Sequence, residues 1–158
     1  MNSAPRYIHI ATLLFRARQH AAMGKENEGF LRFVIALELL LSDRYAIGAS
    51  VTRRAAVLTH RGESEPFEAR LRSITRLYER RSRFVHQGEP VPVDALTEAT
   101  TLCEEVAYCL LRLAKAGSAA EWSAEKWQKE LDFVASAWEA GKEVQPTDLE
   151  RLGLELAP

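Results

Sequence analysis

The stretch from Phe67 to Gly88, FEARLRSITRLYERRSRFVHQG, carries its large apolar residues in steps of three and four. The stripe runs through Leu71, Ile74, Tyr78 and Val85. This spacing places the residues on one face of an α-helix, so it predicts a long amphipathic helix with that face against a core. Gly88 predicts the end of the helix, because glycine readily adopts the left-handed backbone of a C-terminal cap and Pro90 follows it closely.

Arg81 occupies the stripe position between Tyr78 and Val85, where an apolar side chain is expected. A cation on the buried face of a helix costs free energy unless an anion pairs with it. The carboxylate of Glu38 lies in a similar position, within the apolar run from Phe30 to Leu41. We therefore expect Arg81 and Glu38 to meet between their two helices.

The other segments show the same helical periodicity, without the alternation that is typical of strands. The run from Phe30 to Leu41 is apolar almost all round, which is typical of a central buried helix. With short loops between segments, the predicted fold class is an all-α, antiparallel up-and-down bundle of about five to six helices. The predicted helices span roughly residues 5–23, 27–43, 50–60, 65–87, 94–117 and 118–141.

Gly117 predicts a boundary between two parts of the chain. Residues 1–117 form the predicted bundle, and residues 118–158 form a C-terminal helical extension that packs on the bundle or on a partner. The extension begins with the pattern of a helix-capping box at residues 118–121. Trp127 and Trp138 are either core anchors that tie the extension to the bundle or part of a groove that binds a protein partner.

The charge of the chain is balanced overall but unevenly distributed. With 158 residues and a formal net charge of −1, the chain shows no bulk electrostatic preference for nucleic acid or for acidic partners. Residues 51–90 nevertheless contain nine arginines and no lysine, whereas acidic residues predominate after Gly117. This pattern predicts an anion-binding face in the middle of the chain and a solvated or partner-facing end.

The two cysteines lie in one helical segment, and their separation of six residues corresponds to a rise of about 9 Å. That distance is too long for a disulfide within the helix, so Cys103 and Cys109 are expected to be reduced thiols, as in the cytoplasm. The sequence shows no signal-peptide pattern, membrane-spanning run, metal-ligand set or cofactor motif. We therefore expect a cytoplasmic protein without membrane contact, metal or cofactor.

Arg81, Ser82 and His86 together suit the binding and cleavage of a phosphodiester. Ser82 and His86 are four residues apart and share a face, while Arg81 and His86 differ by about 140° around the helix and about 7.5 Å along it. A long arginine and a histidine in the last turn can still converge on one small anion. Histidine transfers protons near neutral pH, and arginine donates hydrogen bonds to the charge that grows on phosphoryl oxygens.

The chain resembles the HEPN superfamily, most of all its Apea-like branch, in three segments: Ala36–Leu40, Arg54–Ala56 and Leu77–Gly88. The shared signature is an arginine, a polar residue, three variable positions and a histidine at the end of a helix. Arg81, Ser82 and His86 match these positions. The resemblance implies a helical bundle that forms a homodimer, in which the motif helices of two protomers face each other across a composite cleft.

Catalytic members of this superfamily are metal-independent endoribonucleases that leave a 2′,3′-cyclic phosphate and a 5′-hydroxyl. The resemblance implies that His86 transfers protons, that Arg81 binds phosphate and stabilises its charge, and that Ser82 is an auxiliary polar contact. Active nucleases often carry asparagine, aspartate or histidine at the polar position, where this chain has serine. The side chains expected to bind substrate nearby are Arg76, Tyr78, Arg80 and Arg83. Glu38 has a supporting role.

Each motif residue also has a purely structural interpretation. Arg81 can serve only as the partner of Glu38, and His86 can stabilise the exposed carbonyl groups at the end of its helix. Arg80 and Arg83 can belong to a solvated face.

Two functions follow from these interpretations. One is an RNA-binding homodimer, RNA-cleaving in its active form, that belongs to a toxin or phage-defence system. The other is a non-catalytic dimerisation or protein-interaction module in which Arg81 is structural.

Overall fold

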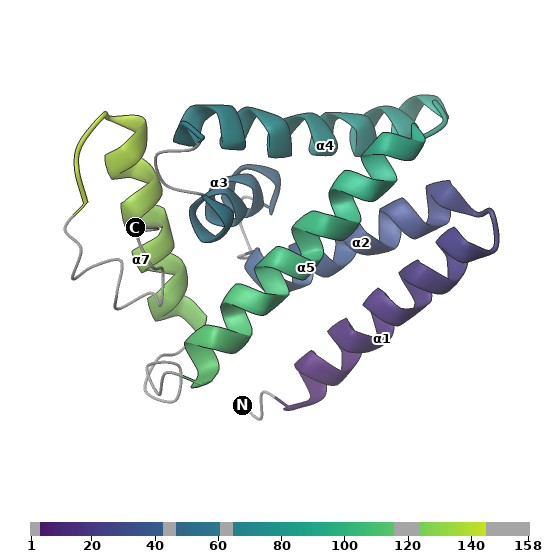
Figure 1. The fold of residues 1–158 in the computed structure, drawn as a ribbon, viewed down its shortest axis with the longest axis horizontal. Coiled ribbons are helices and arrows are strands. Elements are labelled where there is room, and N and C mark those ends of the chain that lie inside the picture. The colour runs from purple at the N-terminus through teal and green to yellow at the C-terminus, as the bar shows by residue number, and fades with distance from the viewer. Residues whose placement is uncertain (1–3, 43–46, 61–64, 116–123, 145–158) are drawn as a thin grey trace.

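A computed structural model of the chain describes residues 4–42, 47–60, 65–115 and 124–144, and all regular structure in these ranges is helical. The described residues form six helices in an all-α bundle (Figure 1). They are α1 (Ala4–Ala22), α2 (Glu26–Leu41), α3 (Ile47–Thr59), α4 (Phe67–Gln87), α5 (Val93–Lys115) and α7 (Ala124–Glu139). The predicted fold class is confirmed, whereas the predicted capping box at residues 118–121 lies outside the described residues. In the described part of the chain, no helix combines the length and apolarity that a membrane span requires.

α2 is the central helix of the bundle and packs against α1, α3 and α5. Phe30, Phe33 and Leu41 are each at most 1% exposed, as expected for a helix that is apolar almost all round. α1 lies antiparallel to α2 (Figure 1). Gly29 allows the two backbones to approach closely, because a Cβ atom at this position would lie 3.1 Å from the carbonyl oxygen of Ala17.

α4 runs along one side of the bundle (Figure 1), and no residue after Leu77 in this helix is fully buried. Its buried residues are Phe67, Ile74 and Leu77. Val85 is 49% exposed, so the prediction that it belongs to the buried stripe is wrong, because the last turns of the helix are only loosely covered. Gly88 ends the helix as predicted, with φ of 71° and its N–H donated to the carbonyl oxygen of Phe84 at 3.0 Å.

Two arginines of α3 hold α7 against the bundle. Arg54 donates Nε and Nη2 to the two carboxylate oxygens of Asp132 at 2.8 and 2.6 Å, and donates Nη1 to the carbonyl oxygen of Leu41 at 2.6 Å. Arg53 forms a second forked pair, with Glu139, at 2.8 and 2.9 Å. Because Arg54 is only 2% exposed, its charge depends on these partners for compensation.

The apolar face of α7 is part of the same core. Its buried apolar residues are Leu131, Val134 and Ala135. The ring of Trp138 lies 5.2 Å from that of Phe67 and 4.8 Å from that of His60, measured between centroids. Trp127 also packs against the buried core. The interpretation of Trp127 and Trp138 as core anchors is therefore confirmed.

Candidate functional site

Arg81 and Glu38 meet between α4 and α2, as the sequence predicts. Arg81 Nη2 lies 3.8 Å from Glu38 Oε1, and the two side chains are 34% and 19% exposed. This distance permits electrostatic attraction but exceeds the length of an N–H···O hydrogen bond. Arg81 follows Ile74 and Leu77 on the core side of α4, at a point where the helix begins to leave the core. The Arg81 side chain is therefore about one third exposed, and Glu38 holds it only loosely.

Tyr78 lies one helical turn before Arg81, and its hydroxyl oxygen is buried without a hydrogen-bond partner among the described residues. Burial raises the pKa of this phenol well above its ordinary value of 10.0; Glu38 and Cys103 raise it further, and Arg81 lowers it. A buried oxygen cannot contact a ligand outside the bundle. The hydroxyl of Tyr78 is therefore turned into the protein, and the expected contact of the Tyr78 side chain with substrate stays a prediction.

Ser82 and His86 lie on the solvent side of α4, four residues apart, and both are exposed. Neither side chain forms a hydrogen bond or ion pair with another residue in the described ranges. His86 occupies the last turn of the helix, where its side chain is exposed. The imidazole is therefore accessible for proton exchange with a bound ligand.

A single chain does not bring the three motif side chains into one closed site. Arg81 faces α2 and Glu38, whereas Ser82 and His86 face solvent. A phosphodiester that touched all three would lie on the open end of α4, and excluding water from it would need a second protein surface. The arrangement fits a site that is completed by another molecule.

Arg80 is surrounded by carboxylates of α5. Its Nη2 lies 3.4 Å from Asp94 Oδ2, and its Nη1 lies 3.8 Å from Glu98 Oε2. Asp94 and Glu98 are four residues apart in the first turns of α5, so they share a face. Asp94 and Glu98 were not among the predicted site residues. Their spacing of four residues and their position at the start of the helix after α4 are the signals that indicate a contact with Arg80.

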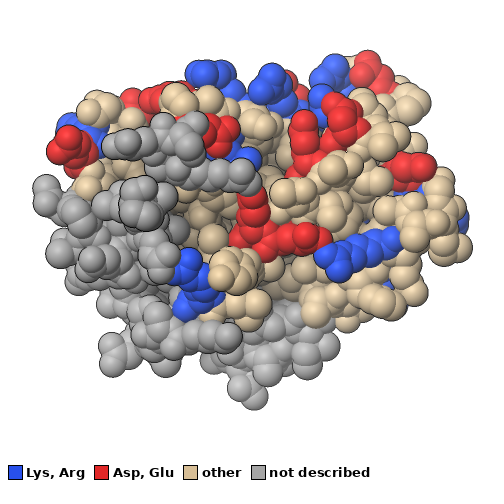
Figure 2. Space-filling view, viewed as in Figure 1, with Lys and Arg blue, Asp and Glu red and all other residues tan. Residues whose placement is uncertain are grey.

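The other basic residues of α4 differ in their surroundings. Arg83 Nη1 lies 3.8 Å from Glu89 Oε2, whereas Arg76 is exposed and pairs with no carboxylate of the described residues. Figure 2 shows basic and acidic side chains intermixed along the upper edge of the molecule, where α4 runs. The positive potential of this surface is therefore weaker than the number of arginines alone would give.

The two thiols of α5 are poor candidates for chemistry. Cys103 donates its S–H to the carbonyl oxygen of Phe33 at 3.2 Å, and Cys109 donates to that of Leu58 at 3.1 Å. Burial raises the pKa of both thiols, so neither is a thiolate nucleophile at neutral pH. Among the residues that the structure describes, no group of three histidine, cysteine, aspartate or glutamate side chains could hold a metal ion.

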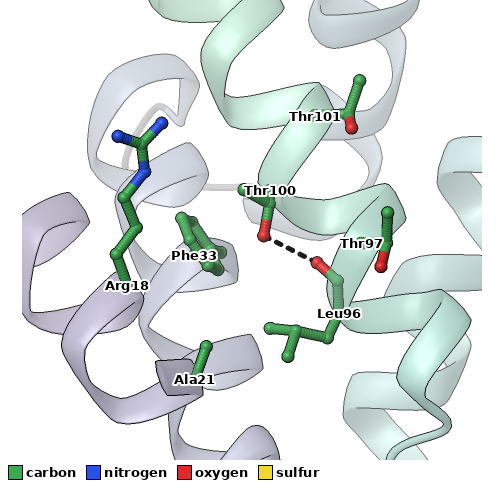
Figure 3. A pocket seen from close by; sticks show the side chains of 7 residues that line it. All are labelled: Arg18, Ala21, Phe33, Leu96, Thr97, Thr100 and Thr101. Atoms are coloured by element: carbon green, nitrogen blue, oxygen red, sulfur yellow. Dashed lines mark hydrogen bonds between the residues drawn. The ribbon is translucent and has the colours of Figure 1, made fainter.

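A hollow of about 270 Å³ between α1, α2 and α5 contains none of the predicted site residues. Its lining, drawn in Figure 3, consists of Arg18, Ala21, Phe33, Leu96, Thr97, Thr100 and Thr101. The Thr100 hydroxyl donates to the carbonyl oxygen of Leu96 in its own helix at 2.8 Å (Figure 3), and Arg18 pairs with Glu104. The hollow therefore presents mainly carbon surface and no evident catalytic group.

No protein-family model, curated protein or solved structure matches the chain. The candidate site therefore rests on its own residues: the loosely paired Arg81 and the exposed Ser82 and His86 at the end of α4.

Proposed function

We propose that this protein is a HEPN-like, RNA-binding homodimer and a metal-independent endoribonuclease of a toxin or phage-defence system. The observation that supports the proposal most directly is that His86 and Ser82 are exposed on the helix that carries Arg81. The carboxylate of Glu38 lies too far from Arg81 for a hydrogen bond, so the guanidinium keeps donors for a ligand. The partly exposed side chain of Arg81 can take a phosphate, and the exposed imidazole can exchange protons.

The chemistry assigns the proton transfers to His86 and the stabilisation of phosphoryl charge to Arg81. An imidazole of His86 takes the proton of a 2′-hydroxyl, whose oxygen then attacks the adjacent phosphorus. Arg81 donates hydrogen bonds to the phosphoryl oxygens as their negative charge grows. The bond from phosphorus to the 5′-oxygen breaks, and this oxygen takes a proton from an imidazolium, which leaves a 2′,3′-cyclic phosphate and a 5′-hydroxyl.

Dimerisation supplies what the single chain lacks. Two protomers that meet at the ends of their α4 helices would place two copies of His86 at one cleft, so that one can act as base and the other as acid. The same contact would cover the phosphodiester and exclude water. The reaction requires no cofactor, and a cytoplasmic location suits the two unpaired thiols.

The test is RNA cleavage by purified protein in the presence of EDTA. Arg81→Ala and His86→Ala should each lower the cleavage rate by about 100-fold or more, since this is the usual contribution of a charge-stabilising donor and of a proton-transfer group, respectively. Arg72→Ala serves as the matched control, because Arg72 is an exposed arginine of the same helix outside the motif. Circular dichroism verifies that all variants are folded, and full activity of a folded His86→Ala variant would refute the assigned role.

A second function is favoured by the acidic surroundings of Arg80 and Arg83. Their pairing with Asp94, Glu98 and Glu89 reduces the attraction of this surface for RNA. In this alternative the chain is a non-catalytic dimerisation or protein-interaction module, and Arg81 serves to join α4 to α2. A protein partner of the C-terminal extension would use the outer face of α7, where Phe133 is 58% exposed. Wild-type protein that dimerises but cleaves no RNA would support this alternative.

A further inference from the structure

The helices α1 and α5 both pack on α2 and together present a surface with few charges (Figure 1 and Figure 2). Three large apolar side chains are exposed here: Phe15 on α1 at 62%, and Tyr108 and Leu111 on α5 at 62% and 61%. An exposed apolar surface with a polar rim is typical of a site where another protein docks. The α1–α5 face comprises Arg18 together with Thr97, Thr100, Glu104, Tyr108 and Leu111, and Phe15 borders it.

The two ends of the α1–α5 face have opposite shapes. Toward the start of α5 lies the hollow of about 270 Å³, with Thr97 and Thr100 in its lining (Figure 3). Toward the end of α5, the exposed side chains of Tyr108 and Leu111 project from the helix. A cavity of about 150 Å³ already binds benzene, so the hollow has room for an aromatic ring.

Glu104 lies midway between these two ends. Thr100 and Tyr108 are each four residues from it, and Thr97 and Leu111 are each seven residues from it. These steps correspond to rises of about 6 and 10.5 Å and keep all five residues near one side of α5. Two copies of α5 that cross in antiparallel directions at Glu104 therefore place Tyr108 over Thr100 and Leu111 over Thr97. The projecting end of each copy then fills the hollow of the other.

The charges at the centre of the face suit the same arrangement. Arg18 and Glu104 are 63% and 52% exposed and pair with each other between the two helices. Arg112 lies at the rim, 6.0 Å from the ring centroid of Tyr108. A two-fold contact has to be self-complementary, and a face with one cation and one anion at its centre meets this condition, because the charges of two copies can alternate around the axis.

The size of the face agrees with a stable contact. α5 has 23 residues and is therefore about 35 Å long, and two adjacent helices are about 20 Å wide. The resulting area of about 700 Å² is close to the ~800 Å² that each partner buries in a specific interface.

We propose that a second copy of this chain docks on the α1–α5 face, related to the first by a two-fold axis near Glu104. Arg81, Ser82 and His86 take no part in this contact, so the inference does not depend on the proposed function. If copies also meet at the ends of their α4 helices, the two contacts together build a tetramer.

The test is the mass of the purified protein in analytical ultracentrifugation over a range of concentrations. Tyr108→Glu should halve the mass of the wild type and weaken the association by about 30-fold or more, since a large aromatic side chain in an interface carries much of its binding energy. Thr100→Arg should act in the same way, because it fills the hollow with a charge. Phe133→Glu is the matched control, since it removes a 58% exposed aromatic side chain from α7 and should leave the mass unchanged. Circular dichroism verifies that all variants are folded.

An equimolar mixture of the Thr100→Arg and Tyr108→Glu chains tests the register. In a mixed pair the two introduced charges face each other and attract, while the second contact, of Tyr108 with Thr100, is that of the wild type. The mixture should therefore regain the mass of the wild type, which neither variant reaches alone.

The outcomes separate this inference from the proposed function. A mass that Tyr108→Glu leaves unchanged would overturn the inference and leave a dimer at the ends of α4 intact. A mixture that keeps the masses of its separate variants would overturn it as well. A wild-type protein that is monomeric at all concentrations would overturn both this inference and the dimerisation that the proposed function requires.

Discussion

Two arginine–carboxylate pairs of this molecule join helices in opposite ways. Arg54 and Asp132 form a forked pair at 2.6 and 2.8 Å, and Nη1 of Arg54 donates to the carbonyl oxygen of Leu41 at 2.6 Å. Arg81 and Glu38 share one long contact of 3.8 Å in a half-open position. The same residue types thus form a short, buried, multiply hydrogen-bonded link in one region and a long, partly exposed ion pair in the other. Distance and burial, rather than residue identity, distinguish these two arginines.

The strongest test of this comparison is Asp132→Asn. The substitution keeps the size of the side chain but leaves the guanidinium of Arg54 buried without its counter-charge. We expect the free energy of unfolding to fall by about 3–5 kcal/mol, which is typical when one member of a buried pair is removed. Urea denaturation measures the change. Glu130→Gln on the same helix is the matched control. If Asp132→Asn lowered the free energy of unfolding by less than about 1 kcal/mol, the pair of Arg54 and Asp132 would contribute no more than a solvent-exposed ion pair.

Alkaline pH should destabilise the region between α2, α4 and α5. The folded-state pKa values of Tyr78 and Cys103 are raised above their ordinary values of 10.0 and 9.0, so the unfolded chain loses these protons first. Stability is therefore complete below about pH 9 and falls as the pH rises, by about 1.4 kcal/mol per pH unit for each group. Urea denaturation between pH 8 and pH 11 checks this slope. Tyr78→Phe should make it shallower above pH 10, and an unchanged slope would show that the phenol also ionises in the folded protein.

The smallest effect is expected for Glu38→Gln. Because the pair with Arg81 is long and partly exposed, its removal should cost about 1 kcal/mol of unfolding free energy or less. The difference between wild type and variant should shrink further between 0.1 and 1 M NaCl, since salt screens exposed charges. A cost close to that of Asp132→Asn would show that Arg81 is a structural arginine after all and would favour the non-catalytic alternative.

Part of the candidate site could be predicted because its signals are local. The pairing of Arg81 with Glu38 follows from two opposite charges that interrupt apolar helix faces, and Gly88 marks the helix end by its backbone preference. The buried hydroxyl of Tyr78 could not be predicted, because its surroundings come from α2 and α5 as well as from its own helix. The same limit applies to the carboxylates beside Arg80, which belong to the next helix.

The sequence by itself determined the all-α class, the central place of α2 and the presence of Arg81, Ser82 and His86 at the end of one helix. These properties depend on helical periodicity and on end signals, which act over a few residues. The tertiary structure decided which arginine is tightly paired. Arg54 forms short hydrogen bonds to Asp132, 78 residues away in the sequence, whereas Arg81 lies 3.8 Å from Glu38. It also decided that Val85 is exposed and that the Tyr78 hydroxyl is buried. Charge compensation and burial depend on how distant helices dock, and no local pattern encodes those distances.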